Sequence, residues 1–237
     1  MNKRLIVIVL VIVAVAGAGF LVLLNRQSQA LQLTTAPMPP PAPAVNIEDL
    51  TARAGAGDAA AQTRLGWAYQ KGAGVKPDIK EALKWFRKAA DKNFPDALAA
   101  LGEMTQSGQG MKADLAEAVR LYRLAAEKGS VAGQYDLAFL YESGNGVEKN
   151  EPAAAKWYQL AAEGGDAFAQ YDIGQRYMLG VGVATNQVQA FKWLALASAG
   201  GQSDSGRLLP ELKSRMSSAD LAEARRLAKE FVPRAGP

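Results

Sequence analysis

The sequence predicts an all-α fold in which four helix-turn-helix repeats of 36 residues stack without insertion. One observation is the spacing of an apolar residue, which recurs in the series Leu65, Leu101, Leu137 and Ile173. A second is that every copy holds two helix-capping positions separated by a pair of glycines. A constant period between roughly 20 and 50 residues is typical of proteins built by stacking one small unit along an axis.

The amino-terminal part predicts a membrane anchor. Residues 5–24, Leu5 to Leu24, carry no charged side chain, and as a helix they would span about 30 Å, the thickness of a bilayer core. Lys3 and Arg4 outnumber Arg26 on the other side. We therefore expect residues 1–4 in the cytoplasm and everything after the anchor on the far side of the membrane.

The alternative is a signal peptide cleaved near Ala30, because Ser28 and Ala30 are the small residues that a signal peptidase reads. Such a peptide would have an apolar region of about 7 to 15 residues, which is shorter than this one, so an uncleaved anchor is favoured. Cleavage would instead release a soluble periplasmic or secreted protein. No cysteine follows the segment, which excludes a lipoprotein anchor.

Residues 25–45 predict a spacer, and residues 46–57 predict a capping helix. The spacer contains five prolines, and proline-rich segments favour an extended chain of about 3.1 Å per residue. We interpret it as a stalk, the alternative being a docking site for a partner. Asn46 and Asp49 then open a short apolar helix that would cover the first repeat.

Each repeat is predicted to begin with a capped first helix that ends at the glycine pair. The repeats are 58–93, 94–129, 130–165 and 166–201. Asp58, Ser130 and Asp166 share the N-cap position, and Pro95 holds the first helical position of the second copy. Glycine after the helix supplies a positive φ or a close backbone approach. The pairs are Gly72 and Gly74, Gly108 and Gly110, Gly144 and Gly146, and Gly180 and Gly182.

The second helix is predicted to open with a capping box, in which the N-cap and a Glu or Gln three residues later cap each other. The N-caps are Asp78, Asp114, Asn150 and Asn186, and three copies have Glu81, Glu117 or Gln189 at the later position. The helix ends at Asn93, Gly129, Gly165 or Gly201, which readily take the left-handed conformation. Its large apolar residue is Trp85, Leu121, Trp157 or Trp193. If Trp157 is buried between repeats, replacing it with alanine should cost about 3 to 5 kcal/mol.

Residues 202–237 predict C-terminal capping helices and a tail. Leu208 and Leu212 continue the first-helix register, with Pro210 at the position of Gly66 and Gly174. Ser217 caps a final helix whose apolar stripe ends at Phe231. Terminal units of a repeat stack are usually atypical in this way.

The runs ALKWFRKAAD and AKWYQLAAEGG, the LG-x-x-Y pattern at 65–69 and the GxGV loops resemble Sel-one-like repeats, a tetratricopeptide-related family. The resemblance covers about residues 58–202. It implies a right-handed α-solenoid that serves as an adaptor or assembly scaffold, often in the bacterial envelope. A cysteine-rich branch of the family is linked to β-lactam binding or hydrolysis, and this chain has no cysteine. Together with the anchor, the resemblance predicts a single-pass protein of the bacterial inner membrane with periplasmic repeats.

Composition argues against an enzyme. The chain has no histidine and no cysteine, so it lacks the commonest general base, the thiolate nucleophile and the commonest transition-metal ligands. We therefore expect no catalytic residue, no cofactor and no metal. The glycine pairs fit neither GxGxxG nor the Walker spacing. Three of the 27 basic residues stand before residue 27, which leaves 24 against 23 acidic residues and predicts no nucleic-acid partner.

Positions that differ between copies are candidates for a binding surface, because positions that all copies share are explained by stacking. One such register of the first helix is Trp67, Glu103, Phe139 and Gln175, and another, four residues earlier, is Thr63, Ala99, Tyr135 and Tyr171. In the related tetratricopeptide fold this helix lines the concave face, and aromatic residues often anchor interfaces. The predicted contact residues for a protein or peptide partner are Trp67, Glu103, Tyr135, Phe139, Tyr171 and Gln175. Packing between repeats is the alternative, particularly for the two tyrosines.

The sequence thus predicts a non-enzymatic interaction scaffold of the cell envelope. The alternative is an envelope enzyme regulator or a protein associated with cell-wall glycan, which a pocket with two facing carboxylates of raised pKa would favour. A soluble secreted binding module is the second alternative. The basic series Lys84, Arg120, Lys156 and Lys192 on the second helix is interpreted as a solvated face. Glu81 and Glu117 are near enough for surface pairing worth a few tenths of a kcal/mol.

Overall fold

A computed structural model describes residues 46–234, which lie within the compact unit Val45–Pro237. The predicted cytoplasmic tip, membrane helix and proline-rich spacer fall in residues 1–45, outside the described residues, as do residues 235–237. The anchor and its contact with a bilayer therefore stay predictions. Within the described part of the chain, no helix is both long enough and apolar enough to cross a membrane.

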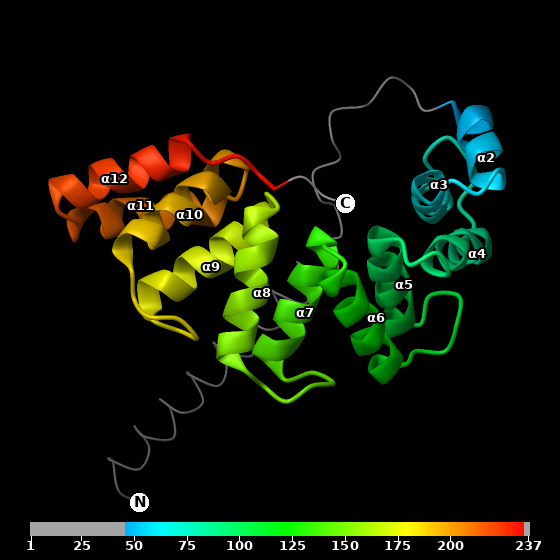
Figure 1. Cartoon of the computed structure of the whole chain (residues 1–237), viewed down its shortest axis with the longest axis horizontal. Helices are drawn as coiled ribbons and strands as arrows, with labels where there is room; N and C mark the ends of the chain where they lie inside the picture. The colour runs from blue at the N-terminus through cyan, green and yellow to red at the C-terminus, as the bar shows by residue number, and fades with distance from the viewer. Residues whose placement is uncertain (1–45, 235–237) are drawn as a thin grey trace, which may run out of the picture. The chain divides into compact units, whose positions relative to one another are not determined.

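Residues 46–234 form eleven α-helices and no strand (Figure 1). The helices are α2 (Ile47–Gly55), α3 (Ala59–Lys71), α4 (Ile79–Ala90), α5 (Pro95–Ser107), α6 (Leu115–Glu127), α7 (Val131–Ser143), α8 (Glu151–Glu163), α9 (Ala167–Leu179), α10 (Gln187–Ala199), α11 (Ser203–Ser214) and α12 (Ser218–Lys229). From α3 to α10 they form four consecutive pairs. Each pair contacts the next one along the chain, and α5 also contacts α7. The predicted solenoid of helix-turn-helix units is confirmed.

The first helices begin and end at the predicted caps. Side-chain oxygens of Asp58, Ser130 and Asp166 accept hydrogen bonds from the backbone N–H three residues later, at 3.0, 3.2 and 2.7 Å. In α5, Pro95 is the first helical residue. At the other end the C-caps have φ between 71° and 75°, a conformation that costs most residues about 1 to 2 kcal/mol. These C-caps are Gly72, Gly108, Gly144 and Gly180.

The predicted capping box of the second helices is only half present. The N-cap side chains accept a hydrogen bond from the backbone N–H three residues later in all four copies, Asp78, Asp114, Asn150 and Asn186. The N-cap's own N–H, however, donates to a carbonyl of the preceding helix, as from Asp78 to Tyr69 at 2.9 Å. Glu81 instead pairs with Lys84 at 2.9 Å. The backbone bond thus ties the two helices of a repeat together, which sequence patterns within one helix do not reveal.

The second glycine of each pair lets the loop touch the preceding repeat. Gly74, Gly110, Gly146 and Gly182 have φ between 71° and 77°. A methyl group at Gly146 would come within 2.9 Å of Leu115 in α6, and one at Gly182 would overlap the carbonyl oxygen of Glu151 in α8. Glycine is therefore required both for the backbone conformation and for the contact.

The core lies between the helices of each pair and between neighbouring pairs. The largest fully buried side chains include Trp193, Tyr122, Tyr158 and Phe86. Small residues permit the close helix contacts, since Ala82, Ala118, Ala154 and Ala190 are all 0% exposed. The tryptophan register is not uniform, because Trp193 is fully buried whereas Trp157 is only half-buried.

The C-terminal cap departs from the repeat pattern. In α11, Pro210 takes the place of the glycine found in three of the four earlier first helices. Helix α12 begins as predicted, with the Ser217 Oγ accepting a hydrogen bond from the Asp220 N–H at 3.1 Å. After α12 the chain runs on past the helix (Figure 1), and the Arg234 N–H reaches the Glu163 carbonyl at the carboxyl end of α8.

Candidate functional site

The residues predicted to bind a partner lie across four neighbouring first helices. Trp67, Glu103, Phe139 and Gln175 take the same position in α3, α5, α7 and α9, and we call them the first-helix strip. The helices that carry Glu103 and Phe139 touch each other. All four side chains are exposed or half-buried, so each presents some surface to solvent.

The two aromatic residues of the strip are its most accessible apolar groups. Trp67 is 37% exposed, and its ring packs edge-on against Phe86 of α4 with the centroids 6.3 Å apart. Phe139 is half-buried and belongs to none of the hydrophobic core clusters formed by residues 46–234. A tryptophan held on one side offers a contact surface whose orientation is already fixed, which lowers the entropy cost of binding.

The register four residues earlier is largely occupied by packing. The rings of Tyr135 and Tyr158 meet edge-on at 5.5 Å, and Tyr135 packs against the core cluster around Trp193. Tyr171 packs against the cluster around Leu194, and its hydroxyl accepts a hydrogen bond from Gln175 at 2.8 Å. Two of the predicted contact residues thus hold one another in place.

Two carboxyl groups in this region are poorly solvated. Burial, together with the nearby negative charges of Glu103 and Asp166, raises the pKa of Asp136 on α7 to about 8. Burial also raises the pKa of Glu103, while Lys71 acts in the opposite direction. A cation brought to this region would favour the ionised carboxylates. Asp136 was not predicted, although its register holds a second acidic residue, Asp172, in the next copy.

A buried arginine joins the third and fourth repeats. Arg176 of α9 contacts Glu142 at 3.1 Å and Glu151 at 2.7 Å, and its guanidinium lies 5.1 Å from the ring centre of Tyr158. The Tyr158 hydroxyl in turn donates to Glu142 at 2.7 Å. Sequence reasoning missed this network. The sequence does contain a sign of it, because the other copies have the apolar residues Ala68, Met104 and Leu140 at the position of Arg176.

The basic series of the second helices divides into two kinds of site. Lys84 pairs with Glu81 at 2.9 Å, and Arg120 pairs with Glu117 at 2.7 Å, both at exposed positions as the solvated-face interpretation expects. Lys192 differs, because its ammonium lies 3.9 Å from the Trp193 ring centre and 5.4 Å from that of Phe231.

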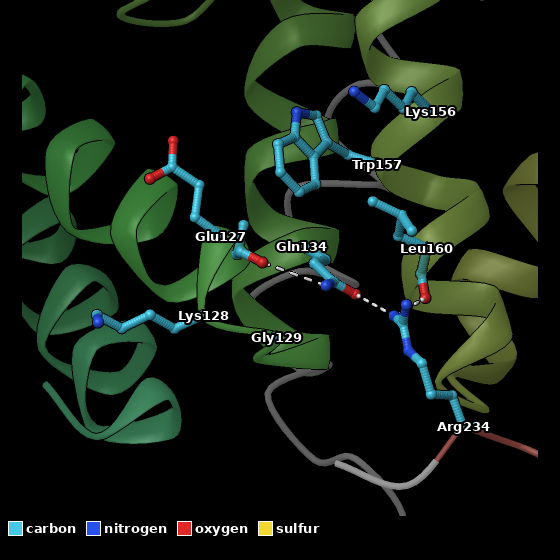
Figure 2. Close-up of a pocket in the computed structure, with 9 residues that line it drawn as sticks. Glu127, Lys128, Gly129, Gln134, Lys156, Trp157, Leu160 and Arg234 are labelled. Atoms are coloured by element: carbon cyan, nitrogen blue, oxygen red, sulfur yellow. Dashed lines mark hydrogen bonds between the residues drawn. The ribbon is translucent and has the colours of Figure 1, made fainter. Parts of the chain in front are cut away.

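A hollow of about 600 Å³ opens beside α8, where the third repeat meets the second (Figure 2). The residues around it are Ala126, Glu127, Lys128, Gly129, Gln134, Lys156, Trp157, Leu160 and Arg234. Figure 2 shows Trp157 and Leu160 on α8, with Arg234 at one end bonded to the Gln134 side chain and the Leu160 carbonyl. None of the predicted contact residues lines it. In residues 46–234, no group of carboxylates is arranged to hold a metal ion.

The repeats match a known family pattern along most of the described chain. The Sel1 repeat model matches residues 59–94, 95–130, 131–166 and 167–202. None of the curated proteins compared with the chain matches it.

Solved structures of repeat proteins are also similar. A Sel1 repeat protein from Oxalobacter formigenes is 36% identical with a TM-score of 0.63, over 69% of this chain and 48% of its own. A protective antigen of uropathogenic Escherichia coli with an SLR fold is 35% identical with a TM-score of 0.64, over 78% of this chain and 41% of its own. This chain therefore spans less than half the length of either relative. An immunity protein from Pseudomonas aeruginosa, 20% identical with a TM-score of 0.50 over 78% of this chain and 70% of its own, shares the fold.

Proposed function

Because the chain belongs to the Sel1 repeat family, whose members are generally protein-interaction scaffolds, we propose that it is a non-enzymatic adaptor of the bacterial cell envelope. It binds a peptide or protein partner through the first-helix strip, on the concave face of the solenoid. The observation that carries this proposal is the 37% exposure of Trp67 in a register whose occupant changes from copy to copy. An exposed tryptophan held by one neighbour is a typical interface anchor.

The electrostatic setting adds a preference for the partner. Burial raises the pKa of both Asp136 and Glu103, so a lysine or arginine of the partner would stabilise their ionised forms. Phe139 and Trp67 supply apolar contacts on the same register. A segment with apolar and basic side chains therefore suits the strip best.

The proposed location is the periplasmic side of the inner membrane, with residues 5–24 as the anchor. Alkaline extraction of membranes and protease treatment of spheroplasts test it, since an anchored protein stays with the membrane and its repeats are digested from outside. An amino terminus at Leu31 in the purified protein would instead establish the cleaved, soluble form.

Crosslinking followed by affinity purification from membranes tests the binding surface. We expect the double variant Trp67→Ala plus Phe139→Ala to lose partners that the wild type captures. The matched control is Lys84→Ala plus Arg120→Ala, which removes exposed charges from the second helices and should leave the partners unchanged. An unchanged set of partners in a folded strip variant would rule out the strip as the binding surface.

A second candidate function is association with cell-wall glycan or regulation of an enzyme that acts on it. The observation that favours it is the pair of carboxyl groups with raised pKa, Glu103 and Asp136. Sedimentation with purified peptidoglycan distinguishes the two. Binding that is lost in Glu103→Gln plus Asp136→Asn, but kept in the Trp67 and Phe139 double variant, would support the glycan function.

A further inference from the structure

The chain's own C-terminal segment occupies a groove between the third and fourth repeats. The Phe231 ring meets the Trp193 ring edge-on at 5.4 Å, and the Lys192 ammonium lies near both rings. Pro233 lies directly over Gly165, where a methyl group would come within 3.2 Å of it. The Arg234 N–H donates to the Glu163 carbonyl at 2.8 Å. Together these contacts hold an aromatic ring, a proline and one backbone N–H.

The hollow beside α8 is the same groove one repeat earlier. Subtracting 36 from Trp193, Lys192, Gly165 and Glu163 gives Trp157, Lys156, Gly129 and Glu127, all of which line the hollow. The walls correspond in geometry as well. Gln134 donates to the Ala126 carbonyl at 3.2 Å, and its counterpart Gln170 donates to the Ala162 carbonyl at 3.2 Å. Gly129 and Gly165 both have φ of 93°.

The two grooves differ as expected if the groove at Trp193 is occupied and the groove at Trp157 is empty. Trp193, beneath the tail, is fully buried, whereas Trp157 is half-buried. The Lys192 ammonium lies 3.9 Å from its tryptophan ring, and the Lys156 ammonium lies 6.0 Å from the Trp157 ring. An aromatic ring placed on Trp157 would cover the indole and give the ammonium a second ring to contact.

The remaining copies do not offer an equivalent site. In the second repeat the register holds Leu121 instead of tryptophan, and Asn93 instead of the glycine. In the first repeat the Lys92 ammonium binds the Gly57 carbonyl, and the Lys88 ammonium lies 4.3 Å from the Trp85 ring centre. The hollow at Trp157 therefore has both the tryptophan and the glycine, Gly129, with unfilled space beside them.

We propose that this hollow binds an extended segment of a partner protein in which an aromatic residue is followed two positions later by a proline. The aromatic ring packs on Trp157 beside Lys156, the proline lies over Gly129, and the next backbone N–H donates to the Glu127 carbonyl. The residue between ring and proline is unrestricted, because its counterpart in the tail, Val232, is 81% exposed. This surface is separate from the first-helix strip, so one chain would hold two partner segments.

Fluorescence anisotropy with the full-length chain in detergent micelles tests the proposal. The probe is a labelled peptide, KEFVPR, which has the sequence of residues 229–234. We expect saturable binding that weakens about tenfold or more in Trp157→Leu, a change to the residue that the second repeat already holds in this register. Peptides with alanine for the phenylalanine or the proline should weaken to a similar extent. Lys84→Ala plus Arg120→Ala, which changes exposed residues outside the hollow, is the matched control and should bind the peptide like the wild type.

A photoreactive group at the phenylalanine of the peptide locates the bound segment. Crosslinks to α8 near Trp157 support the proposal, and crosslinks to α10 near Trp193 overturn it by showing exchange with the tail. Absence of saturable binding in the wild type overturns it as well. Dimers that disappear in Phe231→Ala would identify a second copy as the occupant. Lys156→Glu, an exposed change, keeps the test valid if Trp157→Leu does not fold.

Discussion

Arg176 shows how a single side chain sets one repeat apart. Its register is apolar in the other copies, yet here a guanidinium with 6% of its side chain exposed bridges Glu142 and Glu151. Burial by itself raises the pKa of Glu151, but the hydrogen bonds from Arg176 and Lys149 outweigh it, and the pKa lies below its ordinary value. A carboxylate with a lowered pKa stabilises the fold above its ordinary pKa, and this contribution is lost as the pH falls through the folded value.

Arg176→Met is expected to lower the free energy of unfolding by about 1 to 3 kcal/mol at pH 7, because two carboxylates lose their shared cation. Methionine is the residue of this register in the second copy, so its volume fits. Urea titration at pH 7 and pH 4 measures the effect, which should shrink at pH 4. The exposed Lys149→Met serves as the control and should cost less than about 0.5 kcal/mol. An equal cost at both pH values would contradict the charge-based explanation.

Asp136 should respond to pH in the opposite direction. Its folded pKa of about 8 lies above the ordinary value, so its contribution to stability is full below about pH 4 and is lost as the pH rises through 8. We expect Asp136→Asn to be more stable than the wild type at pH 9 by at least about 1 kcal/mol. Thermal unfolding at pH 5 and pH 9 tests this. The exposed Glu148→Gln is the control and should not become more stable than the wild type at pH 9.

Residue-scale chemistry is the part that the sequence predicted least. Trp67 and Phe139 could be selected because their register varies, but the sequence does not report that Asp136 is poorly solvated or that Arg176 is buried. Both depend on side chains from two or three repeats meeting in space. Similarly, the shared tryptophan register hides the difference in burial between Trp157 and Trp193, the residue on which Phe231 of the tail packs.

At the scale of the helices and loops, the glycine pairs are the most restrictive feature. Gly182 combines a φ of 71° with a backbone contact to Glu151, so a side chain there meets an atom that cannot move independently. Gly182→Ala is expected to destabilise the fold by more than about 2 kcal/mol. A methyl group at Gly55 in α2 would meet no atom within 4 Å, and Gly55→Ala should be neutral or stabilising by up to about 1 kcal/mol. Denaturant titration of both variants makes the comparison, and equal effects would contradict it.

Helix limits were well predicted because caps are local. The N-caps Asp58 and Asp78 and the C-cap Gly72 depend on atoms within about three residues of each other, so spacing alone reveals them. The second half of the capping box was wrong for the opposite reason. The Asp78 N–H bonds to Tyr69, nine residues earlier and in another helix.

At the scale of the whole molecule, stability in a repeat stack comes from each unit and its contacts with its neighbours. Trp193 contributes to both, because it is fully buried and also contacts Phe231 of the tail. Trp193→Ala should cost about 3 to 5 kcal/mol. Trp157→Leu should cost less than half as much, because Trp157 is half-buried and leucine occurs in this register. Guanidinium titration of the two variants tests the order, which would be reversed if Trp157 held the repeats together.

The returning tail changes how the stack folds and unfolds. Contacts in a solenoid join residues that are close in sequence, whereas Arg234 bonds to Gln134 across 100 positions. That link closes the third and fourth repeats and α12 into a loop, so we expect them to gain and lose their structure as one cooperative block. The first two repeats have no such closure among the described residues, and their amides should exchange with solvent hydrogen sooner. A force applied at the carboxyl end would have to peel the tail from α8 before any repeat opens.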